Sequence, residues 1–379
     1  MGQELFPEFS DAEIARRRGL VAELMREQDV ECVVAYGAGK NAEAYWLTNW
    51  PGTRESYLVW PRTGEPVLLV QLFNHVPNAR RMARGAEVRW GGSTSATTLA
   101  DLLRERGMTR RVGVSGALPW RVADELRQKV AGLELVDLSA KVRALHLVKS
   151  AEELERLRIA CRLTDRAMEA LEREARPGMR ESELEAIVEC AYGREGRHGI
   201  HFMATTPMRS PEIGVPSQIQ SWRRIAAGDV LITEISAEYW GYSGQIHRAY
   251  AIGADPTPEY QRIHDIAVET FERVCGALRD GATSDDVLDA AEVVHERGLT
   301  IYDDLLHGTN QLPPILKTRR TTHTPVKGFV FREDMVVVVQ PNVVREDARA
   351  GMQVGETVRI TRDGVERLHS YPMRFVRCA

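Results

Sequence analysis

Apolar and polar residues alternate along the first part of the chain in patterns that predict helices and strands in turn. Residues 11–28 carry apolar side chains at helical spacing, and Ser10 or Asp11 can cap the amino end of this helix. Residues 30–36 are rich in β-branched side chains and predict a strand. The other elements predicted here are strands at 57–60 and 66–70, forming a hairpin around Thr63 and Gly64, strands at 111–114 and 133–138, and helices at 99–106 and 122–130. This alternation is typical of an α/β domain with a mixed sheet.

From residue 150 onward, helices and strands come in separate runs. Ser150 followed by Glu152 and Glu153 predicts a capping box at the start of a long amphipathic helix. The predicted elements are helices at 150–175 and 181–192, strands at 229–237 and 243–253, helices at 259–278 and 284–297, and strands at 335–340, 357–361 and 364–368. Separate runs indicate an α+β domain. We therefore expect two domains, residues 1–148 and 149–379.

Length and composition agree with two domains and narrow the range of partners. The chain has 379 residues, of which 43% are apolar and 27% charged, with a formal net charge of −4. Acids and bases are interspersed, so we expect neither nucleic acid nor a membrane as partner. No apolar run approaches the roughly 20 residues of a membrane span, and no apolar segment opens the chain as a secretory signal would. The five cysteines form no CxxC pair, which predicts reduced thiols and a cytoplasmic protein.

Several short segments, taken in order, resemble those of the creatinase/prolidase family. They are residues 149–153, 181–185, 228–231, 241–248, His307 with Gly308, and 363–365, while the turn at Asp280 and Gly281 replaces the Pro-Gly common in relatives. The resemblance covers the whole chain. It implies an α+β catalytic domain of the pita-bread type, preceded by an α/β creatinase-like N-terminal domain, and a homodimer.

The positions that hold metal ions in this family carry other residues here. The family's metalloenzymes bind two divalent cations with two Asp, one His and two Glu. The resemblance places Glu234, Gln245, Gln311, Gln340 and Gly355 at those positions, and Glu356 would contribute a carboxylate only if the register moved by one residue. A cation pair needs several negative charges, and amides supply none. We therefore expect no metal cofactor. The alternative left open by the residues is a single, weakly bound metal ion.

This loss of ligands resembles the metal-free members of the family, creatinase and ectoine hydrolase, which cleave C–N bonds in small charged substrates. The position of creatinase's catalytic His falls near Ser217. Glu234, followed by Ile235, is instead similar to the corresponding strand of ectoine hydrolase. The implied branch is therefore metal-free and closer to ectoine hydrolase than to creatinase.

Four residues are the candidates for catalysis: Glu234, His247, His307 and His323. Glu234 lies mid-strand among apolar neighbours, where it can serve as general base or nucleophile, or form an ion pair with Arg248. His247 shares a strand face with Gln245 and can move protons near neutral pH, or bond a carbonyl as a structural residue.

His307 matches the family's substrate-side histidine, and we expect it to donate a proton or polarise a carbonyl; the alternative is that it braces its loop. His323 lies in a loop that can reach the site or remain at the surface.

A second group of residues is predicted to bind substrate. Its members are Gln245, Gln311, Gln340, Arg248, His201, Phe202, Arg319, Arg320, Trp50 and Arg54. The three glutamines can orient substrate by hydrogen bonds, and an arginine can clamp a carboxylate or stay solvated. In relatives the segment starting at His201 lines the pocket. The loop holding Trp50, Arg54 and Glu55 covers the partner's site in creatinase-like dimers, although ordinary loop packing would also account for it.

Two motifs are set aside. His295 and Glu296 begin like a zinc-protease HExxH motif, but the second His is missing. The glycines at 37 and 39 lack the third glycine of a dinucleotide loop and predict a turn.

Three functions remain. The first is metal-independent hydrolysis, or a related rearrangement, of a C–N bond in a small, carboxylate-bearing amino-acid derivative. The second is an Xaa-Pro-type metallopeptidase with an atypical site. The third is a protein that binds peptides or small molecules without catalysis.

Overall fold

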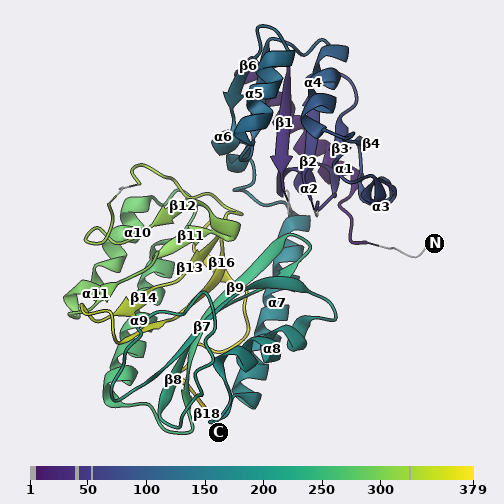
Figure 1. The fold of residues 1–379 in the computed structure, drawn as a ribbon. Coiled ribbons are helices and arrows are strands. Elements are labelled where there is room, and N and C mark those ends of the chain that lie inside the picture. Colours follow the sequence, from purple (N-terminus) through teal and green to yellow (C-terminus); the bar gives the residue numbers. More distant parts are fainter. Residues whose placement is uncertain (1–5, 39–41, 53, 324–325) are drawn as a thin grey trace. The chain divides into compact units, whose positions relative to one another are not determined.

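The chain divides into two compact units, Met1–His146 and Leu147–Ala379, in the computed structural model (Figure 1). The structure describes residues 6–38, 42–52, 54–323 and 326–379; the side chains at 42, 198 and 311 lie outside that description, and so does Gly39 of the predicted turn. No helix in the described part of the chain is both long enough and apolar enough to cross a membrane.

The N-terminal unit is an α/β domain built on a six-stranded sheet with the order β4-β3-β2-β1-β5-β6. Its strands are β1 (Cys32–Gly37), β2 (Ser56–Pro61), β3 (Val67–Val70), β4 (Glu87–Trp90), β5 (Arg111–Ser115) and β6 (Glu134–Asp137). Its helices are α1 (Asp11–Glu27), α2 (Ala42–Thr48), η1 (Phe73–His75), α3 (Val76–Met82), α4 (Ser95–Glu105), α5 (Trp120–Lys129) and α6 (Ser139–Ala144). Strand β2 runs antiparallel to both neighbours and the other pairs are parallel, so the sheet is mixed as predicted.

The second unit contains a large sheet in which three long strands lie side by side. The sheet runs β12-β11-β13-β16-β9-β8-β7, with β17 beside β16 and β18 beside β9, and a small sheet has the order β10-β14-β15. The long strands are β7 (Arg197–Pro207), β8 (Asp229–Tyr239) and β9 (Tyr242–Ile252). The shorter strands are β10 (Thr300–Ile301), β11 (Leu306–Gly308), β12 (Leu312–Leu316), β13 (Val336–Val339), β14 (Asn342–Val344), β15 (Gly351–Gln353), β16 (Gly355–Ile360), β17 (Val365–Arg367) and β18 (Val376–Cys378).

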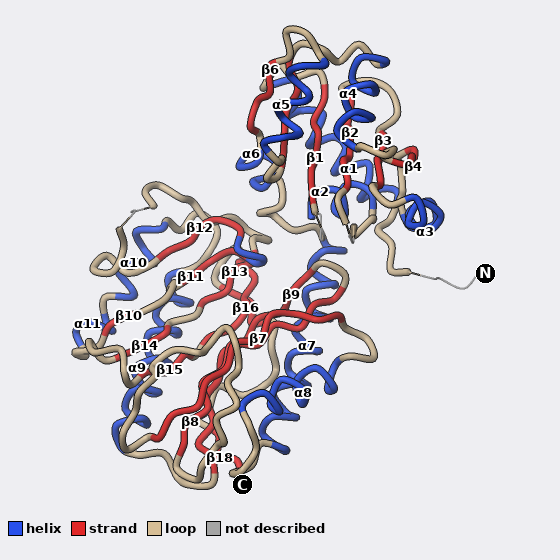
Figure 2. The backbone as a smooth tube through the Cα atoms, in the orientation of Figure 1, coloured by secondary structure: helices blue, strands red, loops and turns tan. Residues whose placement is uncertain are grey.

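Helices α7 and α8 pack against β8 and β9 (Figure 2). The helices of this unit are α7 (Ala151–Glu174), α8 (Glu181–Tyr192), α9 (Pro258–Ala277), α10 (Ser284–Ala291), α11 (Val293–Glu296) and η2 (Thr309–Gln311). Ser150 and Glu153 form the predicted capping box of α7. Ile235 and Ile246 lie opposite each other and join the core beneath α7 and α8. Because side chains alternate along a strand, their neighbours Glu234, Gln245 and His247 lie on the other face.

Glycine permits the close contact of α7 with β9. A Cβ at Gly244 would lie 2.4 Å from the backbone nitrogen of Cys161. Thr164 of α7 also donates a hydrogen bond to the Gly244 carbonyl, over 2.6 Å, and accepts one from Ala237 over 3.0 Å. The helix therefore holds the strand directly beside Gln245.

Candidate functional site

The candidate site is built on the face of the sheet that points away from α7 and α8. Glu234 lies directly opposite His247 on β9 and opposite Phe202 on β7, so the three side chains share one face. Glu234 retains 8% of its exposure, and His247 is fully buried. Three of the predicted site residues, Glu234, His247 and Phe202, therefore lie side by side on one face of the sheet.

Gln245 connects the carboxylate to the rest of the site. Its side-chain nitrogen lies 3.0 Å from Glu234 Oε1, 2.9 Å from Gln340 Oε1 and 3.1 Å from His247 Nε2. Thr357 holds the Gln245 backbone, donating to its carbonyl over 3.0 Å and accepting from its N–H over 2.9 Å. Thr357 was not among the predicted residues, because nothing in its local pattern separates it from other strand threonines.

His307 lies at the far end of this network. Its Nδ1 is 2.8 Å from the carbonyl oxygen of Gly308, and its Nε2 is 3.2 Å from Gln340 Oε1. The network therefore extends from Glu234 through Gln245 and Gln340 to His307.

Burial controls the charge of His247. It is the main reason that the pKa of this histidine lies below its usual value. The nearby Glu234 carboxylate, with Oε2 at 3.7 Å, raises that pKa, and the charges of His307 and Arg248 lower it. We therefore expect His247 to be neutral near pH 7.

Asp304, which precedes β11, was missed by the sequence reasoning. Burial is the main reason that the pKa of the Asp304 carboxyl is raised, and the charge of the preceding residue, Asp303, raises it further. Lys317 and His307 lower this pKa, and Glu234 raises it. Its position depends on how the chain enters β11, and a sequence pattern does not report that.

The register of β16 decides which residue occupies the last of the family's metal positions. Gly355 pairs with His247 and lies toward the site, whereas Glu356 pairs with Ile246 and lies on the opposite face. A Cβ at Gly355 would lie 2.1 Å from the Val339 carbonyl oxygen and 2.7 Å from Gln340 Cα. There is thus no side chain at this position and no room for one.

Arg248 is a structural residue, and its predicted contact with substrate is wrong. Its guanidinium is fully buried and binds Glu356 over 2.5 Å. Its other hydrogen bonds go to backbone carbonyls of His247, Gly355, Tyr371 and Pro372. These five contacts use all five N–H donors of an arginine. Arg248 therefore pairs with Glu356 and not with Glu234, which was the alternative considered for that carboxylate.

Three further substrate-binding predictions are wrong, because the side chains have other partners. His201 pairs with Ile235 on the helix-facing side, where its Nε2 lies 2.6 Å from the hydroxyl of Tyr192. Arg319 lies 2.8 Å from Asp289, and Arg320 lies 3.1 Å from Glu292, so both pair with acids of or just after α10.

The remaining predicted residues divide by exposure. Trp50 is 3% exposed within the N-terminal unit, so the predicted contact with a partner's site is not available to it. Arg54 is exposed and stays a prediction. His323 is exposed on a bend, and no contact among the described residues joins it to Glu234. The side chain of Gln311 lies outside the described residues.

The donor set does not fit the family's pair of divalent cations. Glu234 is the one carboxylate at the five positions, and Glu356 is held by Arg248 and Arg367 on the other face. Within the described ranges, no three His, Cys, Asp or Glu side chains gather as a metal site would require. Two cations need several anionic ligands, so these residues are unsuited to holding them.

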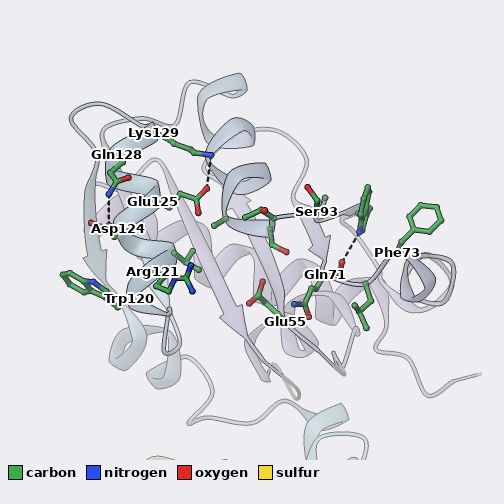
Figure 3. Close-up of a pocket in the computed structure, with 17 residues that line it drawn as sticks. Glu55, Gln71, Phe73, Ser93, Trp120, Arg121, Asp124, Glu125, Gln128 and Lys129 are labelled. Atoms are coloured by element: carbon green, nitrogen blue, oxygen red, sulfur yellow. Dashed lines mark hydrogen bonds and ion pairs between the residues drawn. The ribbon is translucent and has the colours of Figure 1, made fainter.

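A cleft of about 820 Å³ lies in the N-terminal unit (Figure 3). Glu125 lies between Thr97 and Lys129, at 2.5 Å and 2.9 Å, and Glu55 and Gln71 lie at the lower part of the cleft in this view. None of the predicted catalytic residues lines it. The cleft therefore has no place in the candidate site.

Comparison with known proteins assigns both units to described domains. Residues 155–362 match metallopeptidase family M24, and residues 17–148 match the creatinase/prolidase N-terminal domain. The chain is 27% identical over 267 residues to an Xaa-Pro dipeptidase of Pyrococcus furiosus, across 69% of this chain and 74% of that protein.

Solved structures share the fold. A prolidase from Pyrococcus horikoshii OT3 superposes with a TM-score of 0.80 at 21% identity, covering 94% of this chain and 99% of that one. An Xaa-Pro dipeptidase from Bacillus anthracis gives 0.83 at 20% identity, covering 96% and 99%. The predicted two-domain pita-bread architecture is confirmed. The relatives named here give no support to the narrower assignment to an ectoine hydrolase-like branch.

Proposed function

Because the chain belongs to metallopeptidase family M24 and carries a creatinase/prolidase N-terminal domain, we propose that it hydrolyses a C–N bond at the site formed by Glu234, Gln245, His247, Gln340 and His307. It is a hydrolase of this family. The observation that carries the proposal is the continuous network from a buried carboxylate, through two amides, to an imidazole. The substrate class we propose is a small, polar amino-acid derivative or short peptide.

Each group has a role that its geometry permits. Glu234 takes a proton from the attacking water, or attacks the carbon itself, because it keeps a small exposed fraction on the site face. His247, neutral and 3.7 Å from Glu234, orients that carboxylate. His307 protonates the leaving nitrogen, and Phe202 gives the site an apolar wall opposite Glu234.

The narrower proposal is that turnover needs no metal. Its support is the donor set: amides at three of the ligand positions, no side chain at Gly355, and Glu356 bound by arginines on the other face. No step of the proposed reaction uses a metal ion.

An Xaa-Pro-type metallopeptidase is the second candidate. The named relatives are Xaa-Pro dipeptidases, and they favour this function over metal-independent hydrolysis. The residues at the ligand positions weigh against it. A binding protein without catalysis is a third reading, and the network around Glu234 weighs against that.

Two properties remain predictions from the resemblance and from composition. They are a homodimer, in which the loop near Arg54 reaches the partner's site, and a cytoplasmic location.

The test is a screen of Xaa-Pro dipeptides and of N-acylated and amidated amino acids, with and without chelator. We expect turnover that survives chelation. We also expect Glu234→Gln to lower kcat/KM by at least about a hundredfold, because the general base is lost. Glu238→Gln is the matched control, since Glu238 lies on the same strand and is also 8% exposed. A wild-type rate in Glu234→Gln, with an unchanged melting temperature, would remove Glu234 from the mechanism.

A further inference from the structure

We propose that Gln245 and Gln340 are positioning residues that tie the proton on His307 to the charge on Glu234, so that the site holds a base and an acid at the same time. Their use in catalysis rests on the proposed function, but the coupling itself does not.

The Gly308 carbonyl fixes one end of the network. A carbonyl oxygen only accepts, so His307 Nδ1, 2.8 Å away, carries a hydrogen. A neutral imidazole then presents a bare lone pair at Nε2. Gln340 Oε1 lies 3.2 Å from that nitrogen and is also an acceptor. Either His307 is doubly protonated, or the Gln340 amide is turned over so that its NH₂ group faces His307.

The first arrangement begins with ionised Glu234. A carboxylate only accepts, so Gln245 directs its NH₂ group toward Glu234 Oε1, at 3.0 Å. The second hydrogen of that NH₂ group points to Gln340 Oε1, at 2.9 Å. Gln340 therefore presents its oxygen to His307 as well, and His307 must carry a hydrogen on Nε2. An ionised Glu234 thus requires a doubly protonated His307.

The second arrangement begins with neutral His307. Gln340 then turns its NH₂ group toward His307 Nε2 and Gln245, and Gln245 must present its oxygen. That oxygen faces Glu234 Oε1, so Glu234 must be protonated. His247 keeps its hydrogen on Nε2 in both arrangements, directed to Glu234 Oε2 in the first and to the Gln245 oxygen, at 3.1 Å, in the second.

The two arrangements differ by the position of one proton and by the turning of two amides. The first has one negative and one positive group, the second has none, and the summed charge is zero in both. Neighbouring charges act mainly on the first arrangement, because the second has no charged member: Asp304 and Lys317 lie near the His307 end, and Arg248 lies behind His247. Two glutamines in sequence are needed, since one amide would reverse the relation between the ends.

Hydrolysis would convert the first arrangement into the second. Glu234 takes one proton from water while the hydroxide oxygen bonds to the substrate carbon. The C–N bond breaks, and its nitrogen takes the proton from His307. Glu234 is then protonated and His307 neutral, which is the second arrangement. Returning that proton from Glu234 to His307, with both amides turned back, restores the first.

The test is the imidazole ¹⁵N spectrum of the full-length chain at pH 7, with the His307 signals assigned through His307→Gln. It reports whether each ring nitrogen carries a hydrogen. We expect Glu234→Gln to lower the ratio of doubly protonated to neutral His307 by about tenfold or more in the wild-type background, and by less than about threefold in a Gln340→Met background. Such a cycle separates the coupling through the amides from the direct field of Glu234.

Two further variants sharpen the result. Gln340→Glu can only accept, so His307 should stay doubly protonated even when Glu234→Gln is added. Gln353→Met is the matched control: Gln353 is fully buried on β15, and neither end of its amide has a hydrogen-bond partner among the described residues, so His307 should behave as in the wild type.

Equal effects of Glu234→Gln in both backgrounds, or a His307 without a hydrogen on Nδ1, would overturn the coupling. Because the spectrum needs no substrate, these outcomes are separate from failure of the proposed function. A coupled network in a protein that hydrolyses nothing would refute the function alone.

Discussion

At the scale of single residues, one step along a strand separates the candidate site from the structural core. His247 faces Glu234. The next residue, Arg248, donates all five of its N–H hydrogens to Glu356 and to backbone carbonyls. Alternation along strands made the shared face of Gln245 and His247 predictable. The same alternation places Arg248 and His201 on the opposite face, so the prediction that they bind substrate is wrong.

The predictions for Glu234 and Gln340 rested on two independent signals. Both residues lie in predicted strands, and both also match positions of the family pattern. Arg319 and Arg320 had only their closeness in sequence to His307. Each forms an ion pair with an acidic residue in or just after α10, because a flexible cationic side chain on the surface pairs with a nearby carboxylate.

A buried ion pair outside the site gives a prediction on stability and pH. His369 Nδ1 lies 2.7 Å from Asp165. Burial opposes the charged form, yet Cys161 and Asp165 raise the pKa of His369 to about 10. A histidine whose pKa is higher in the folded state contributes stability that is complete below its unfolded pKa of about 6.5 and is lost as pH rises through about 10.

We therefore expect His369→Gln to lower the free energy of unfolding by about 3–5 kcal/mol at pH 6, with a difference from wild type that shrinks toward pH 10. Urea denaturation of both proteins across this range measures it. A difference that stays constant or grows with pH would show that His369 is not held as a cation.

At the scale of elements, the strands and helices with strong periodicity were predicted closely. The predicted helix at 181–192 matches α8 at both ends, and the strand at 229–237 falls within β8. The helix predicted at 284–297 is interrupted at Glu292, between α10 and α11. Strands β10, β14 and β15 were missed, because they have only two or three residues each, too few to show a period, and β10 pairs with a strand about 40 residues further along the chain.

Strand β16 illustrates how an element shapes the site through its backbone. Gly355 brings β16 within contact of Val339 and Gln340, and we expect Gly355→Ala to push these apart. The predicted cost is about 3 kcal/mol of unfolding free energy, together with a loss of turnover because Gln340 moves.

Gly364→Ala is the control for this change, since among the described residues only Gly364 itself and its two chain neighbours have atoms within 4 Å of the added Cβ. Thermal or urea unfolding, with the rate at saturating substrate, compares the two variants. If Gly355→Ala were as stable and active as Gly364→Ala, the inference that β16 packs too tightly on β13 to admit a side chain at Gly355 would be wrong.

At the scale of the whole molecule, fold and chemistry were predictable to different degrees. The switch from alternating elements to separate runs indicated two domains, and the architecture is that of the family. The chemistry depends on side-chain direction and register, which fold resemblance does not determine. In the metalloenzymes of this family the fold holds metal ions. In this chain the same fold positions amides, imidazoles and one carboxylate.

The most direct measurement of the central claim is the metal content of the purified full-length protein, taken with its rate before and after chelation and after adding back Mn²⁺, Co²⁺ or Zn²⁺. We expect well under one equivalent of transition metal per chain and a rate that neither chelation nor added metal changes. Two equivalents per chain, removed by chelator together with activity and restored with it, would show that the site is a metal centre.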